Sequence, residues 1–173
     1  MTSLLRIAAL ALPVAGLAGL WALSDFQSRQ GSEWEVAISG YDPRDLLRGH
    51  YVEFSYDWEG LAGPEASMPP PERLCLEGDP PGPPVARRIE GAGSDCEYLA
   101  EADYGSLYGA ESLLRGRLYV DQARAREIDD ALRDRSQQAV VTVRLGSNRR
   151  LTPIAIAFRP ASTGALRPRA TEE

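Results

Sequence analysis

Few side chains in this chain of 173 residues could carry out acid–base or nucleophilic chemistry. All 19 basic residues are arginine, so no lysine can act as a general base, a Schiff-base former or a phosphate ligand. His50 is the only histidine, and no Gly-x-Ser-x-Gly turn supplies a serine nucleophile for it. We therefore expect a protein that is not an enzyme, and an unrecognised hydrolase is the least favoured alternative.

Acidic residues occur in pairs at two places, Asp42 with Asp45 and Asp129 with Asp130. The first pair lies in a predicted turn and the second on the polar side of a predicted helix, where solvation explains it. No spacing indicates a glycosidase acid pair, and no glycine-rich phosphate loop is present. The sequence predicts neither a cofactor nor a metal site.

Cys75 and Cys96 are the only cysteines. In an oxidising compartment an isolated pair predicts one disulfide, which here would close a loop rich in proline and glycine and contribute about 3 kcal/mol. Two unrelated thiols are the alternative. A metal site is disfavoured, because the pair lacks Cys-x-x-Cys spacing and the single histidine is remote.

The N-terminal residues 1–24 contain an uncharged apolar run from Ile7 to Leu23. Arg6 precedes the run and Asp25 follows it, so the positive-inside rule places the N-terminus in the cytoplasm. We expect a single-pass, uncleaved anchor in a bacterial cytoplasmic membrane, with the remainder in the periplasm. A cleaved signal peptide, with Ala22 and Ser24 before the cut, remains the alternative.

The formal net charge is −6, and the chain beyond residue 24 carries −7 because only Arg6 is lost. An acidic domain without a basic stripe is a poor partner for nucleic acid or for anionic lipid headgroups. We therefore expect no nucleic-acid partner and contact with the bilayer only through the N-terminal helix.

Hydrophobic periodicity predicts an α+β fold: a mainly antiparallel β-sheet or small open barrel, with one helix in the C-terminal half and an N-terminal transmembrane helix. A stalk (25–32) leads to a β-rich domain (33–159), and a disordered tail (160–173) ends the chain. The helix is expected from Gln122 to Asp134 with Asp121 as its N-cap. Pro153 predicts an edge or bulged strand. The expected strands are 34–39, 50–58, 73–77, 85–89, 117–120, 139–145 and 151–158. Two hairpins are expected, 73–77 with 85–89 and 139–145 with 151–158. Alternation within 50–58 predicts one core face and one polar face. The core face holds His50, Val52, Phe54, Tyr56 and Trp58, and the polar face holds Tyr51, Glu53, Ser55 and Asp57.

The segment from Tyr41 to Tyr56 resembles the bacterial family named for its GDYXXLXY motif, in which an upstream D-P-R-D-L-L-R-G stretch is typical. Gly49, Tyr51 and Tyr56 match the motif. His50 replaces its aspartate, so no role of that acid transfers to this chain, and Phe54 replaces its leucine. The resemblance implies a membrane-anchored protein without established activity, and a polytopic membrane protein as a possible partner.

We call the segment from Tyr41 to Tyr56 the corner, and two interpretations of it remain open. In the structural one, Asp42 and Asp45 form and cap turns, Gly49 allows an unusual backbone angle, and Tyr51 and Tyr56 pack with solvent-facing hydroxyls. In the functional one, four side chains line a groove for an anionic ligand or a partner loop: Arg44, Arg48, His50 and Tyr51.

The function expected from these features is a membrane-tethered extracytoplasmic module that binds or stabilises a membrane protein. The alternative is a sensor or binder of a small envelope ligand or polymer. That alternative predicts a pocket lined by Arg48, Tyr51 and either Tyr104 or Tyr108.

Overall fold

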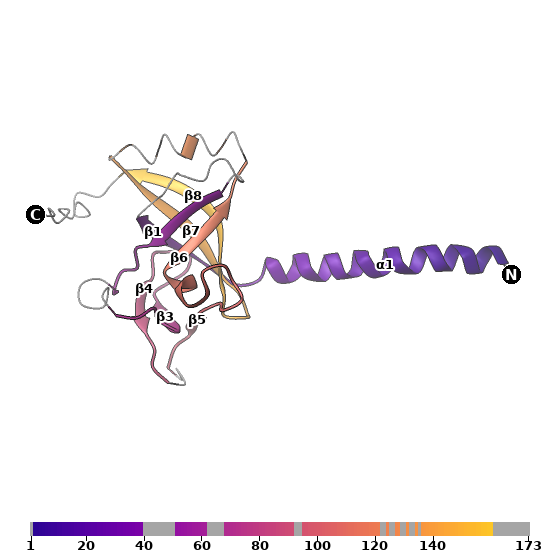
Figure 1. Cartoon of the computed structure of the whole chain (residues 1–173), viewed down its shortest axis with the longest axis horizontal. Coiled ribbons are helices and arrows are strands. Elements are labelled where there is room, and N and C mark those ends of the chain that lie inside the picture. The colour runs from indigo at the N-terminus through magenta and orange to yellow at the C-terminus, as the bar shows by residue number, and fades with distance from the viewer. Residues whose placement is uncertain are drawn as a thin grey trace, which may run out of the picture. The chain divides into compact units, whose positions relative to one another are not determined.

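A computed structural model describes residues 2–39, 51–61, 68–91, 95–121 and 136–160, together with Arg124, Glu127, Ile128, Ala131 and Asp134. The chain divides into two compact units, Met1–Gly31 and Ser32–Glu173 (Figure 1). The first unit is a helix and the second is a β domain.

Helix α1 spans Thr2–Ser28. It continues five residues past the apolar run, into the segment expected to be a stalk, and Asp25 pairs with Arg29 at 2.9 Å one turn later. Large apolar side chains along the helix are exposed, including Leu12 at 75 % and Trp21 at 71 %. Over the part of the chain that the structure describes, no helix combines the length and the apolarity needed to cross a membrane.

The β domain contains two antiparallel sheets, which confirms the expectation of a mainly antiparallel β-sheet. The five-stranded sheet has the order β6-β2-β1-β7-β8, and the three-stranded sheet has the order β4-β3-β5. Among the described strands no ladder joins β6 to β8, so the larger sheet is not a closed barrel. The bounds are β1 Ser32–Ser39, β2 Tyr51–Tyr56, β3 Arg73–Glu77, β4 Val85–Arg88, β5 Tyr98–Glu101, β6 Arg115–Tyr119, β7 Gln137–Leu145 and β8 Leu151–Pro160, with a 3₁₀ helix η2 at Gly109–Leu113.

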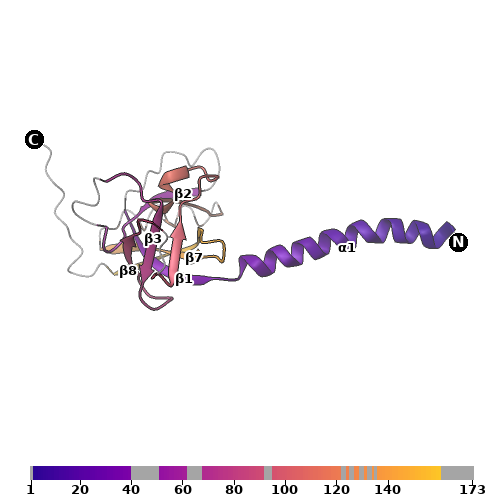
Figure 2. The same ribbon diagram turned by 90° about the horizontal axis from the view of Figure 1, so that it is seen from below.

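Strand β1 is the centre of the five-stranded sheet. Its residues 32–37 pair with β7, in a register that places Ser32 opposite Leu145, and its last two residues pair with β2. Figures 1 and 2 show β1 beside β7 from two directions. The strand that directly follows the N-terminal unit therefore has a hydrogen-bonded neighbour on each side.

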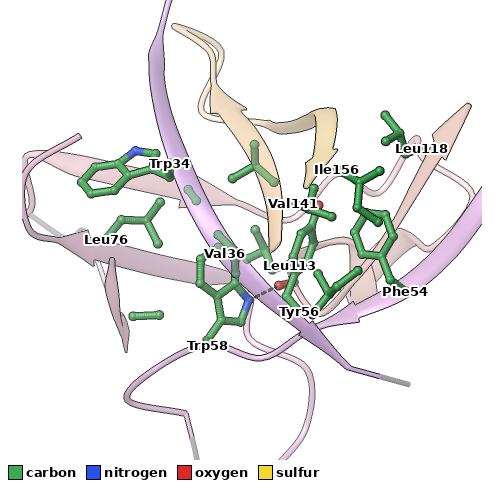
Figure 3. Packing of buried hydrophobic residues seen from close by; sticks show 14 of the residues in the cluster. Trp34, Val36, Phe54, Tyr56, Trp58, Leu76, Leu113, Leu118, Val141 and Ile156 are labelled. Carbon is green, nitrogen blue, oxygen red and sulfur yellow. Dashed lines mark hydrogen bonds between the residues drawn. The ribbon is translucent and has the colours of Figure 1, made fainter. Parts of the chain in front are cut away.

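Strand alternation builds the core as the sequence predicts. On β2, Val52, Phe54 and Tyr56 are buried, and Trp58 continues the same face beyond the strand. Figure 3 shows Phe54, Tyr56 and Trp58 among buried side chains from both sheets. His50, expected on this face, lies outside the described residues. The other labelled members are Trp34, Val36, Leu76, Leu113, Leu118, Val141 and Ile156.

Both predicted hairpins are confirmed, because β3 pairs with β4 and β7 pairs with β8. Pro153 lies on an edge strand, and the register shifts beside it between Thr142 and Val143. Pro153 has no N–H for a ladder, so an edge position with an irregular register accommodates it. The expectation of an edge or bulged strand is confirmed.

The disulfide between Cys75 and Cys96 is confirmed, with Cα atoms 5.7 Å apart. It ties β3 to the segment that leads into β5, and β3 and β5 are also paired directly. The bond therefore adds a covalent link between β3, the central strand of the three-stranded sheet, and the chain that enters the edge strand β5.

The predicted helix from 122 to 134 is described at a few positions only. Arg124, Glu127, Ile128 and Ala131 are helical, and the Asp121 carboxylate accepts a 2.9 Å hydrogen bond from the backbone N–H of Arg124. That bond is the N-cap expected of Asp121. Asp134, the expected last residue of the helix, is described and is not helical. Outside the described residues lie the other positions of the predicted helix, the tail from 161, and the corner residues Asp42, Arg44, Asp45, Arg48, Gly49 and His50.

Candidate interaction surface on the outer face of β2 and β6

The outer face of β2 and β6 carries three cross-strand pairs. Tyr51 lies opposite Tyr119, and Glu53 lies opposite Arg117. These residues alternate with the buried ones along each strand, so their side chains all leave the sheet on the side away from the core. The third pair is Ser55 with Arg115.

The central pair is a partly buried ion pair. The Arg117 guanidinium donates to one Glu53 carboxylate oxygen through Nη2 and, at 3.2 Å, through Nε. The Tyr108 hydroxyl donates to the same oxygen at 2.8 Å. The guanidinium carbon also lies 3.9 Å from the centre of the Tyr51 ring, a cation–π distance. Arg117 is thus held between a carboxylate and an aromatic face.

These contacts fix the charges of the cluster. The hydrogen bond from Arg117 lowers the pKa of Glu53, against the opposing effect of burial. The pKa of Tyr108 is raised to about 12, mainly by burial and secondly by the hydrogen bond to Glu53. Burial disfavours the charged form of Arg117, but its interactions with Glu53 and with nearby tyrosines raise its pKa overall. None of the three groups is suited to exchange protons near neutral pH.

The loop before η2 is pinned beside this cluster. This loop comprises residues 102–108. Near its end, the Tyr108 hydroxyl donates to Glu53, and near its start, the backbone N–H of Asp103 donates to Ser112 Oγ in η2 at 2.6 Å. The loop exposes Tyr104 at 65 % and Leu107 at 71 %. Tyr119 on β6 is 72 % exposed. The arrangement is therefore a braced surface with solvent-facing aromatic and aliphatic side chains, and not a reactive centre.

The two motif tyrosines do not share a site. Tyr51 belongs to the outer cluster, where its ring lies 6.0 Å from that of Tyr119. Tyr56 points into the core, its ring 5.4 Å from Phe54, and burial raises the pKa of its hydroxyl. The expectation of a solvent-facing Tyr56 hydroxyl is wrong, because positions 51 and 56 differ by an odd number and so fall on opposite faces of the strand.

Three residues of the ion-pair cluster and its rim were not among the predicted site residues: Glu53, Arg117 and Tyr119. Tyr108 was named only as a lining residue of the alternative ligand pocket. Alternation along β2 did place Glu53 beside Tyr51, which was the available signal. The partners of Glu53 lie 55 and 64 residues further along the chain, so only the sheet order could reveal them.

The ligand pocket expected beside Arg48 falls partly outside the described residues. A cavity of about 500 Å³ lies elsewhere, between β8 and the helical residues after Asp121. Neither Tyr51, Tyr104 nor Tyr108 lines it, and Arg48 is outside the described residues. Within the described ranges no group of three or more histidine, cysteine or acidic side chains could hold a metal ion.

The fold and this surface define a small antiparallel β domain that follows an N-terminal helix. A family model described as GDYXXLXY protein matches residues 13–155, and the chain belongs to that family. Comparison with curated proteins and with solved structures gives no significant match.

Proposed function

We propose that this protein is a membrane-tethered extracytoplasmic module that binds or stabilises a polytopic membrane protein. Helix α1 serves as the single-pass anchor, and the β domain presents its outer β2–β6 face to the partner. The observation that carries the proposal is the exposure of large apolar side chains along α1.

The anchor assignment is supported by the sequence and by the helix surface. Residues 7–23 carry no charge, and the exposed side chains of Leu12, Val14 and Leu20 point in different directions around the helix. A helix that is apolar on all sides is stable inside lipid or against another protein. Arg6 before the run and Asp25 after it favour a cytoplasmic N-terminus.

The compartment is supported by the disulfide. Cys75 and Cys96 are bonded, and disulfides persist in oxidising compartments such as the bacterial periplasm. An extracytoplasmic β domain fits both the bond and the charge distribution around α1.

The interface assignment is supported by the outer surface. Tyr119, Tyr104 and Leu107 are all more than 60 % exposed, and bonds to Glu53 and Ser112 brace the segments that carry them. Aromatic anchors on a rigid support lose little entropy on binding and are frequent in interface centres.

Two measurements test the proposal on the full-length protein in its native membranes. Alkaline carbonate extraction should leave the chain in the pellet. Crosslinking and affinity capture should recover one stoichiometric membrane protein. That protein should be lost from a Leu107→Ser, Tyr119→Ser double variant and kept by Met68→Ser, which removes an apolar side chain 47 % exposed elsewhere.

The results that contradict the proposal are distinct. Release of the chain by carbonate would exclude an integral anchor. Retention in the pellet with no captured protein, or capture that both variants preserve, would keep the anchor and exclude the β2–β6 face as the interface.

A further inference from the structure

A cavity of about 500 Å³ opens between β8 and the helical residues that follow Asp121. Its size is within the range of roughly 300–1,000 Å³ that is typical of small-molecule sites. Ile128 and Ile156 line it and are 3 % and 4 % exposed, as members of the hydrophobic core. Phe158, which packs against that core, and Ala131 complete the apolar wall. The cavity is thus an outward extension of the core.

Charged side chains lie only on part of the lining. Asp121 uses its carboxylate to cap the backbone N–H of Arg124 at 2.9 Å, which fixes the first helical turn. Arg124 and Glu127 follow three residues apart, so they lie on neighbouring turns of one helical face, and both are exposed. The cavity therefore combines an apolar wall with one positive side chain, Arg124, and two negative ones, Glu127 and the Asp121 carboxylate that caps the helix.

We propose that this cavity binds a single-chain zwitterionic amphiphile. The alkyl chain fills the space between Ile128, Ile156 and Phe158. Arg124 attracts the phosphate of the headgroup, and Glu127 attracts its ammonium group. A ligand of this class matches both parts of the lining, because burying an alkyl chain removes apolar surface from water and each headgroup charge meets the opposite sign.

The alternatives of purely anionic or purely polar ligands fit less well. The chain carries a net charge of −6, which repels anions, and Glu127 adds a negative charge at the site. A polar ligand would leave its hydrogen-bonding groups unsatisfied against the four apolar side chains. The proposal does not depend on the partner or on the β2–β6 face, because none of the cavity residues belongs to that surface.

The test uses full-length protein held in amphipathic polymer, free of lipid and detergent. The probe is lysophosphatidylcholine with a photoactivatable diazirine in its acyl chain. After irradiation, mass spectrometry should locate the label on residues 124–131 and on β8. An excess of unlabelled lysophosphatidylcholine should remove the label, and dodecyl phosphate at the same concentration should remove much less.

Two variants fill space on opposite faces. Ala131→Phe places a ring in the cavity and should reduce labelling at least fivefold, whereas Ala157→Phe, on the exposed face of β8, should leave it unchanged.

Arg124→Glu changes an exposed side chain, so it tests the site without disturbing the core. It should abolish the preference for lysophosphatidylcholine over an uncharged monoacylglycerol competitor.

Three results would overturn the proposal. They are labelling that unlabelled lipid does not compete, labelling confined to α1, and labelling that persists in folded Ala131→Phe protein. If Ala131→Phe does not fold, an unchanged competitor preference in Arg124→Glu overturns it equally.

Discussion

The indole N–H of Trp58 donates a 2.7 Å hydrogen bond to the carbonyl oxygen of Leu113 inside the core (Figure 3). Both residues are at most 3 % exposed. The bond joins the residue just beyond β2 to the end of η2, 55 positions away along the chain. It thereby fixes the loop that carries Tyr108 relative to the strand that carries Glu53.

We predict that Trp58→Phe destabilises the domain by roughly 2–4 kcal/mol, because the Leu113 carbonyl loses its buried donor and the smaller ring leaves a cavity. Urea denaturation followed by circular dichroism measures the change. Trp21→Phe, at a 71 % exposed position of α1, is the matched control and should leave the domain transition in place. Equal stability of the two variants would refute the role given to this bond.

A second prediction concerns Glu53 and pH. Its pKa is lowered in the folded protein from the ordinary value of 4.5, chiefly by Arg117. The resulting stability is present above the ordinary pKa and is lost as pH falls through the lowered one. Glu53→Gln should therefore cost about 1–2 kcal/mol at pH 7 and progressively less in acid.

Urea titrations from pH 7 down to the most acidic pH at which the domain folds measure this dependence. Glu77→Gln breaks the Arg87 pair, whose side chains are 53 % and 52 % exposed, and should have a much smaller effect at every pH. A difference between wild type and Glu53→Gln that stays constant with pH would contradict the assignment.

Gly116 on β6 is predicted to tolerate no side chain. A Cβ atom there would lie 2.5 Å from Phe54 Cε2 and 2.7 Å from the Tyr56 hydroxyl. Gly116→Ala should lower the thermal midpoint and cost roughly 1–3 kcal/mol, because the core must shift to admit the methyl group. In Gly105→Ala the closest atom is a flexible Asp103 carboxylate oxygen at 3.4 Å, and little change is expected. Comparable losses in both variants would count against this packing argument.

The Cys75–Cys96 bond should account for about 3 kcal/mol of the free energy of unfolding. Reduction of the wild type and the Cys75→Ala, Cys96→Ala double variant should each show this loss in urea denaturation, and reductant should not affect the variant further. Intact mass under non-reducing conditions should show no free thiol in protein recovered from native membranes. Two free thiols there would also remove a support for the extracytoplasmic location that we propose.

The elements whose periodicity is strong were predictable from sequence. Alternation along β2 identified Val52 and Phe54 as core residues, and Pro153 marked an irregular edge strand. Both signals are local, because a strand's buried face and a missing N–H are visible in a few consecutive residues. The disulfide was likewise predictable, because Cys75 and Cys96 are the only two cysteines.

Relationships between distant segments were not predictable. Tyr98–Glu101 forms β5, but four residues between irregular segments carry too little periodicity to identify a strand. The Glu53–Arg117 pair depends on β2 lying beside β6, and the sequence of neither strand indicates which strand is its neighbour. Helix α1 extends to Ser28 because helical bonding and the Asp25–Arg29 pair continue beyond the apolar run that defined its expected end.

The central position of β1 gives the domain a mechanical property. Only residues 29–31 connect α1 to this strand, so any tension applied through α1 enters the sheet at Ser32. A pull directed along β1 loads its six pairs with β7 together, in shear, whereas a pull across it opens them one after another from the Ser32–Leu145 end. The rate of forced unfolding therefore depends on the direction of the load, and the domain resists best when the load runs along the strand.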